Sequence, residues 1–140
     1  MVNPPKGFFP ASAILNTPWK QWLLVLGWAL FLLVISLLPS SSLPNINLWE
    51  QLITPDKLAH ALVYGVFAVL LYLPLRSWRI KPGLVAILLA SAYGAAMEGL
   101  QLISKTGRSY DLADMLANVV GAILGYSLAS LIEKKYRNSI

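Results

Sequence analysis

The chain contains one stretch that decides its fold, Asp111-Leu-Ala-Asp114-Met-Leu-Ala-Asn118-Val-Val-Gly121-Ala-Ile-Leu-Gly125. The polar and glycine residues of this stretch recur at alternating intervals of three and four, which places them on one face of a helix. The segment continues to Ile132 without a further charge, so the helix is long enough to enter a bilayer. A polar face on such a helix is expected to contact protein or water, because ionisable groups are costly in lipid.

The composition places the chain among membrane proteins. Of its 140 residues, 57% are hydrophobic and 12% are charged, and the mean hydropathy is +0.64. The chain has no cysteine and a single histidine, His60, so we expect no zinc centre and no two-histidine haem site. The net charge of +5 comes from Lys and Arg residues that flank apolar runs. This pattern indicates membrane topology and not a nucleic-acid partner.

Four apolar runs predict an all-α, polytopic membrane protein with four transmembrane helices in a bundle. We expect the helices at about residues 19–38, 57–75, 83–103 and 111–132, within one domain over residues 19–137. Residues 1–18, which include four prolines, are expected to form a flexible cytoplasmic tail. A signal peptide is the alternative interpretation of the first run, although the run is longer than a typical signal-peptide core. Between the first two runs, Asn47 and Glu50 resemble a capping box, which indicates either a short interfacial helix or a plain loop.

Positive charges are divided unevenly between the two ends of the predicted helices. The N-terminus, the connection between the second and third runs, and the C-terminus hold Lys6, Lys20, Arg76, Arg79, Lys81, Lys134, Lys135 and Arg137. The opposite side holds Lys57, Lys105 and Arg108. Because cytoplasmic loops are enriched in Lys and Arg, both termini are expected to face the cytoplasm.

Polar residues concentrate at the predicted outer ends of the second, third and fourth helices. The candidate catalytic residues are His60, Glu98 and Asp114, because imidazole and carboxylate groups can transfer protons. The candidate substrate contacts are Lys57, Tyr64, Gln101, Arg108, Asp111 and Asn118. Structural roles are the alternative for several of them. Asp111 and Asp114 are also suited to capping the fourth helix, and His60 to an interhelical hydrogen bond.

Glu98 is the hardest of these residues to explain by structure alone. It lies inside the third helix and so cannot cap it, and a carboxylate there needs a partner, a proton or water. We expect Asn118 and Arg108 to meet it. Helix packing is the expected role of Gly121 and Gly125, which form a GxxxG pattern.

These residues occur in a fixed order along the chain. The order is Asp56-Lys57-x-x-His60-x-x-x-Tyr64, then Glu98-x-x-Gln101, then Arg108-x-x-Asp111-x-x-Asp114-x-x-x-Asn118-x-x-Gly121-x-x-x-Gly125. This ordered set resembles the VanZ-like family of small bacterial membrane proteins. The resemblance implies a helical protein of the cell envelope, and a named member of that family is linked to lowered sensitivity to the glycopeptide teicoplanin. It does not imply an established reaction.

Two functions fit the polar residues. In the first, an outer pocket binds or acts on a polar or phosphate-bearing envelope lipid, with anion contacts from Lys57, His60, Lys105 and Arg108. In that pocket, Glu98, Asp111 and Asp114 would supply a general base or the oxygen ligands of Mg²⁺ or Ca²⁺. An enzyme of this kind would be a transferase or hydrolase of a lipid-linked substrate. In the second, the protein is a non-catalytic interaction or structural module, and its charges lock the helices together or dock a partner.

Overall fold

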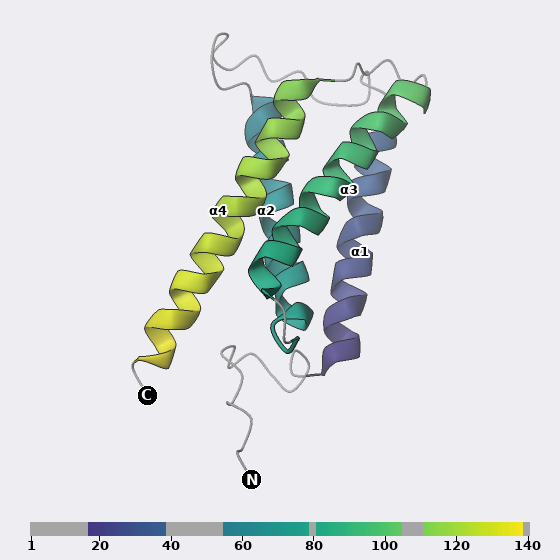
Figure 1. Cartoon of the computed structure of the whole chain (residues 1–140). Coiled ribbons are helices and arrows are strands. Elements are labelled where there is room, and N and C mark those ends of the chain that lie inside the picture. Colours follow the sequence, from purple (N-terminus) through teal and green to yellow (C-terminus); the bar gives the residue numbers. More distant parts are fainter. Residues whose placement is uncertain (1–16, 39–54, 79–80, 105–110, 139–140) are drawn as a thin grey trace.

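Four helices form the protein in a computed structural model that describes residues 17–38, 55–78, 81–104 and 111–138 (Figure 1). In chain order they are α1 (Pro18–Leu37), α2 (Pro55–Leu75), α3 (Pro82–Ser104) and α4 (Leu112–Arg137). The described residues include no strand, so the predicted all-α fold is confirmed. Most of the expected N-terminal tail and the capping box at Asn47 and Glu50 lie outside the described residues.

Local sequence explains where the helices begin. Pro18, Pro55 and Pro82 each occupy the first residue of a helix, where the missing N–H of proline costs nothing because that N–H would have no partner within the helix. α4 begins instead after Asp111, whose side-chain Oδ1 accepts a 2.7 Å hydrogen bond from the backbone N–H of Ala113.

The C-terminal end of α4 differs from the prediction. The sequence suggested an end at Ile132, but the helix continues to Arg137. Two features stabilise the extra turn. First, its last turn holds Lys134, Lys135 and Arg137, whose positive charges are stabilised by the negative end of the helix dipole. Second, Tyr72 of α2 donates a 2.7 Å hydrogen bond to Glu133 Oε2.

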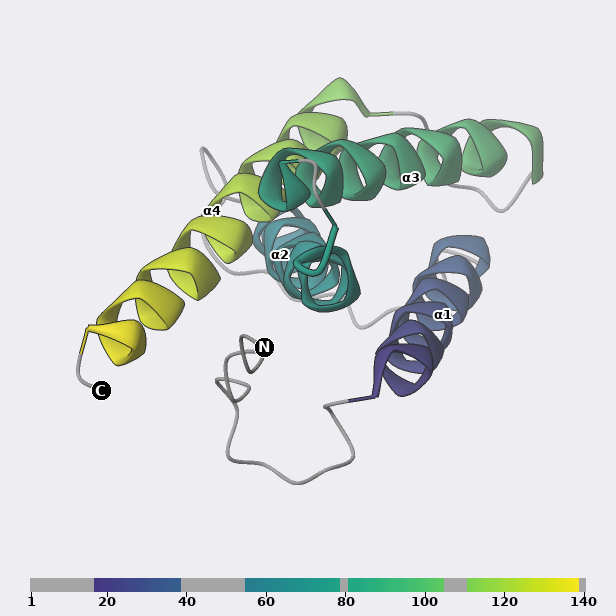
Figure 2. The ribbon, with the colours of Figure 1, turned by 60° about the horizontal axis from the view of Figure 1, so that its bottom comes forward.

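The helices are arranged around a central pair. α2 and α3 pack against each other and against both remaining helices, whereas α1 and α4 lie on opposite sides of this pair (Figure 2). The start of α1 and the end of α4 lie at the same end of the bundle (Figure 1). All four helices are long and apolar enough to cross a membrane, and many large apolar side chains on them face outward. A lipid environment would solvate these side chains.

Two hydrogen bonds join α1 to the central pair. Tyr93 of α3 donates its hydroxyl to the Ala29 carbonyl of α1 at 2.7 Å. Trp28 of α1 donates its indole N–H to the Val63 carbonyl of α2 at 3.0 Å. These bonds join different helices where few other polar groups are available, so they define how α1 sits against the central pair.

Glycines bring the backbones of α2 and α4 together. A Cβ added at Gly121 would lie 2.6 Å from the Ala61 Cα, and one added at Gly125 would lie 2.8 Å from the Gly65 Cα. Real side chains do not approach this closely, so only glycine fits at these two positions of α4. This contact brings the first turns of α2 and α4, which hold most of the polar residues, close to each other.

Candidate functional site

Polar side chains from three helices meet at the end of the bundle where α2 and α4 begin and α3 ends. We call this group the polar cluster and define it as Asp56, Lys57, His60, Glu98, Asp111, Asp114 and Asn118. Four of its members are carboxylates and one is a lysine, so the described part of the cluster carries an excess of acidic groups. The cluster includes six of the nine residues proposed from the sequence as catalytic or substrate-binding, together with Asp56.

Asp111 is a helix cap and an ion-pair partner at once. Besides accepting the Ala113 N–H, its carboxylate lies 3.2 Å from Lys57 Nζ. The Ala113 N–H and then the Lys57 ammonium lower the pKa of Asp111, because both stabilise its charged form. The capping role suggested for Asp111 by the sequence is therefore present in the structure.

Glu98 is buried and contacts the same helix start. It is 1% exposed, and its Oε2 accepts the backbone N–H of Asp111 at 3.4 Å. In a capping box, a glutamate within the helix accepts the N–H of the cap residue. Here Glu98 does so from α3, so the sequence argument that considered only its own helix missed this role. The expected partner Arg108 lies outside the described residues.

Asp114 behaves differently from Asp111 although it lies only one turn further along α4. It is 8% exposed, and its Oδ1 has no hydrogen-bond partner among the described residues. Lys57 Nζ lies 3.5 Å from Oδ1, which makes an ion pair without hydrogen-bond geometry. A buried carboxylate oxygen without a hydrogen bond destabilises the folded protein, so we expect this oxygen to bind a ligand or a proton.

His60 and Asn118 connect α2 to α4 directly. His60 Nδ1 lies 3.0 Å from Asn118 Oδ1, and Asn118 is 1% exposed. Because an amide oxygen can only accept, Nδ1 is the donor of this hydrogen bond, and in the neutral ring Nε2 then presents its lone pair. The ring of His60 stacks on that of Tyr64 at a centroid distance of 6.4 Å. A Cβ at Gly94 of α3 would lie 2.8 Å from Asn118 Nδ2, so glycine leaves the room that Asn118 needs.

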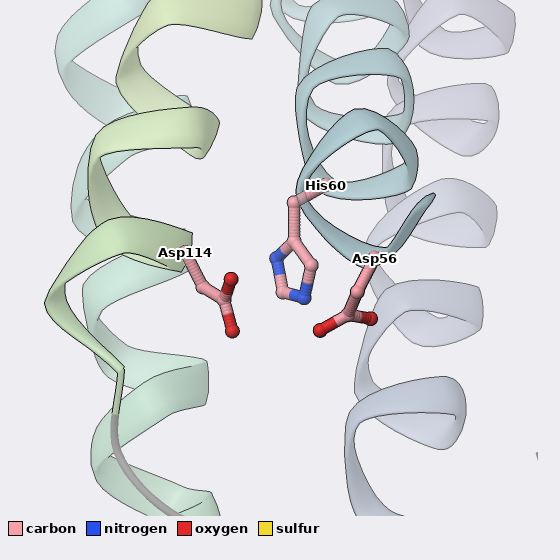
Figure 3. Close-up of side chains that lie close together, drawn as sticks. All are labelled: Asp56, His60 and Asp114. Carbon is pink, nitrogen blue, oxygen red and sulfur yellow. The ribbon is translucent and has the colours of Figure 1, made fainter. Parts of the chain in front are cut away.

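A second carboxylate reaches His60 from its own helix. Figure 3 shows the imidazole between the carboxylates of Asp56 and Asp114, with one ring nitrogen turned toward Asp56. One potential ligand atom from each of these three residues lies within 4.8 Å of the other two. The sequence suggested Glu98, Asp111 and Asp114 as a general base or as oxygen ligands of Mg²⁺ or Ca²⁺, and among the described residues Asp114 groups with Asp56 and His60. Asp56 is part of the sequence motif but was not proposed as a ligand. Its position four residues before His60 places both side chains on one face of α2, which could have indicated a shared site.

The remaining candidates lie apart from the polar cluster or outside the described residues. Gln101 donates to the Ser36 carbonyl of α1 at 3.3 Å, which satisfies a carbonyl in the last turn of that helix. Tyr64 is 2% exposed and contributes its ring to the packing beneath His60. Lys105 and Arg108, two of the expected anion contacts, lie outside the described residues.

An apolar groove of about 520 Å³ runs between α2 and α4. Its lining begins at Leu58, next to Lys57 of the polar cluster, and reaches Arg76 and Glu133 at the other end of the helices. The glycine contact of Gly65 with Gly121 and Gly125 forms its floor, because residues without side chains leave space there. The groove and the polar cluster are therefore built by the same two helices.

Comparison with known proteins identifies the family of the chain. No curated protein and no solved structure matches the chain. One family model, described as VanZ/LLP1, matches residues 7–133 and so covers nearly the whole chain. With four helices able to span a membrane, the protein is a multi-pass membrane protein, and it belongs to the VanZ/LLP1 family.

Proposed function

We propose that the protein binds an envelope lipid that carries a polar or phosphate-bearing headgroup, with the headgroup at the polar cluster and a hydrocarbon chain in the groove between α2 and α4. One observation carries the proposal. The lining of the groove is apolar between its two ends and includes Leu58, the residue that follows Lys57, so a molecule with an apolar chain and a polar head would match both the groove and the polar cluster.

The proposal also assigns an orientation. The residues that flank the opposite end of the helices include Arg76, Lys134 and Lys135, and we propose that this end and both termini face the cytoplasm. The polar cluster would then face the outer leaflet of the cell membrane. Such a site would be in a position to bind cell-envelope lipids, and we propose lowered sensitivity to teicoplanin as the phenotype to test in bacteria that express the protein.

The charges of the polar cluster indicate which chemical groups a bound lipid headgroup would carry. Lys57 already faces Asp111 and Asp114, so it is not a free anion contact. A headgroup with hydroxyl or amine donors alongside its phosphate would suit the surplus of carboxylates better than phosphate alone.

A structural module is the second candidate, and three contacts favour it. The pairs Lys57–Asp111, His60–Asn118 and Glu98–Asp111 each join two different helices. On this alternative the polar cluster locks α2, α3 and α4 together or docks a partner, and no lipid is selected.

Native mass spectrometry of the protein purified in mild detergent separates the two candidates. We expect the wild type to retain a discrete phosphate-bearing lipid. Val66→Trp, which fills the groove, should lose it, whereas Leu88→Trp places the same side chain on an outward-facing position of α3 away from the groove and should keep it. Lys57→Gln should reduce retention while the protein stays folded. The absence of any specific lipid from the wild type, together with a loss of thermal stability in Lys57→Gln, would contradict lipid binding and favour the structural module.

A further inference from the structure

We infer that Asp56, His60 and Asp114 bind a divalent cation at the polar end of α2 and α4. The three residues supply one imidazole nitrogen and two carboxylate oxygens, and one potential ligand atom from each lies within 4.8 Å of the others (Figure 3). The ligands come from two helices, and the glycine contact of Gly121 with Ala61 holds these helices together. This contact positions His60 of α2 and Asp114 of α4 relative to each other, whereas Asp56 is exposed at the start of α2.

Asp114 gives independent support for a ligand. The Asp114 side chain is 11% exposed, and within the part of the chain that the structure describes its Oδ1 has no hydrogen-bond partner. Figure 3 shows its carboxylate directed toward His60. The Lys57 ammonium, 3.5 Å from Oδ1, offsets part of the charge but leaves that oxygen without a hydrogen bond. A cation between the three residues would satisfy this oxygen, to which no described residue donates a hydrogen bond.

Asn118 prepares His60 for this role. In metal sites, a ligating histidine usually donates its other ring N–H to a neighbouring acceptor, which holds the ring in place and selects the nitrogen that binds. The Nδ1 proton of His60 points to the buried Oδ1 of Asn118 at 3.0 Å. In the neutral ring, Nε2 is thus left with its lone pair for a cation.

The donor set points to a particular class of cation. Imidazole favours transition metals and zinc, whereas Mg²⁺ and Ca²⁺ prefer oxygen ligands, so one imidazole with two carboxylates suits Mn²⁺ or Zn²⁺. Bonds of about 2.0–2.2 Å require the ligand atoms to draw closer than 4.8 Å. Asp56 is exposed at the start of α2 and can make this movement by rotating its side chain. Three protein ligands leave further positions for water or for an oxygen of a bound molecule.

A simpler explanation exists for the two carboxylates alone. Asp56 and Asp114 both lie in the first turn of a helix, where the positive end of the helix dipole stabilises a negative charge. That explanation does not account for the imidazole between them, or for a buried Asp114 Oδ1 to which no described residue donates a hydrogen bond. The two explanations differ in whether His60 bonds to a cation.

Electron paramagnetic resonance with Mn²⁺ tests this directly in the wild type. Untagged, chelator-treated protein in detergent should bind about one Mn²⁺ per chain, seen as a loss of the free Mn²⁺ signal, and Zn²⁺ should displace it. Because His60 is the single histidine of the chain, pulsed measurements of the bound Mn²⁺ should show coupling to imidazole nitrogen that changes when histidine is labelled with ¹⁵N. No binding at millimolar Mn²⁺, or binding without nitrogen coupling, would overturn the proposal.

Variants add a matched comparison. Asp56→Asn and Asp114→Asn should each weaken Mn²⁺ binding by at least about tenfold, and Asn118→Ala should weaken it by about 10–100-fold through the orientation of His60. Glu133→Gln removes a carboxylate at the other end of α4 and should leave binding unchanged. Equal binding by Asp114→Asn and Glu133→Gln would contradict the site.

The site does not depend on the proposed lipid function, and two measurements keep the outcomes apart. Mn²⁺ binding with no retained lipid would contradict the lipid proposal alone. Retention of a specific lipid by protein that binds no Mn²⁺ would contradict the metal site alone.

Discussion

His60 and Asn118 are 58 residues apart in the sequence, yet His60 Nδ1 lies 3.0 Å from Asn118 Oδ1 across the contact between α2 and α4. This bond sets which ring nitrogen of His60 carries the proton. The bond forms beside the close approach of Gly121 to Ala61, and it joins the buried amide of Asn118 to His60, the group most suited to proton transfer or metal binding. The chemistry of the polar cluster thus follows from how closely two helices pack.

Replacement of Gly121 by alanine should destabilise the bundle. The new methyl group would meet the backbone of Ala61, and overpacking of this kind typically costs about 1–3 kcal/mol. Gly27→Ala is the matched control, because a Cβ at Gly27 has nothing within 4 Å, and alanine is favoured over glycine in a helix by up to about 1 kcal/mol. Thermal unfolding in detergent should therefore show a lower midpoint for Gly121→Ala and an equal or higher one for Gly27→Ala. Equal midpoints for both variants would mean that α2 and α4 do not pack in this way.

Asp111 should make the protein sensitive to acid. Its pKa lies below the ordinary value of 3.8, because the Ala113 N–H and Lys57 favour the carboxylate. A lowered pKa in the folded state adds stability above the unfolded pKa, and this stability is lost as the pH falls from that value through the folded pKa. Asp111→Asn keeps a good capping side chain but removes the charge. The variant should be less stable than the wild type at pH 7, and the difference should shrink toward pH 3. A difference that stays constant over this range would argue against a charge effect.

The sequence predicted the helices because their signals are local. Four long apolar runs and the charges between them are sufficient to locate membrane helices, and the GxxxG pattern at Gly121 and Gly125 indicated close packing. The end of α4 was placed too early at Ile132, because the prediction ended the helix at the first charges. The residues that carry these charges remain in the helix, because Tyr72 donates a hydrogen bond to Glu133 and because the lysines lie at the negative end of the helix dipole.

Pairing within the polar cluster could not be predicted in the same way. Asp111 and Asp114 look equivalent in the sequence, and both lie near Lys57, but Asp111 caps α4 whereas Asp114 is buried with its Oδ1 lacking a hydrogen bond to any described residue. The difference depends on the rotation of α4 relative to α2, which no local pattern specifies. For the same reason the sequence did not show that Lys57 faces two carboxylates, or that Asp56 accompanies His60.

The proposed orientation can be tested with single cysteines, because the chain has none of its own. Ser104 and Ser77 are exposed residues at opposite ends of the bundle, at the end of α3 and after α2. In intact cells, Ser104→Cys should react with a membrane-impermeant maleimide, and Ser77→Cys should react only after the membrane is opened. The reverse pattern would place the polar cluster on the cytoplasmic side.

The central claim is that α2 and α4 hold a prearranged site in which His60 presents Nε2. Nitrogen NMR of protein labelled with ¹⁵N-histidine measures this most directly, because His60 gives the only histidine signals. In metal-free protein above the pH at which the ring is charged, we predict the tautomer with the proton on Nδ1, and Asn118→Ala should lose that preference. A proton on Nε2 in the wild type, or a tautomer unaffected by Asn118→Ala, would contradict the account.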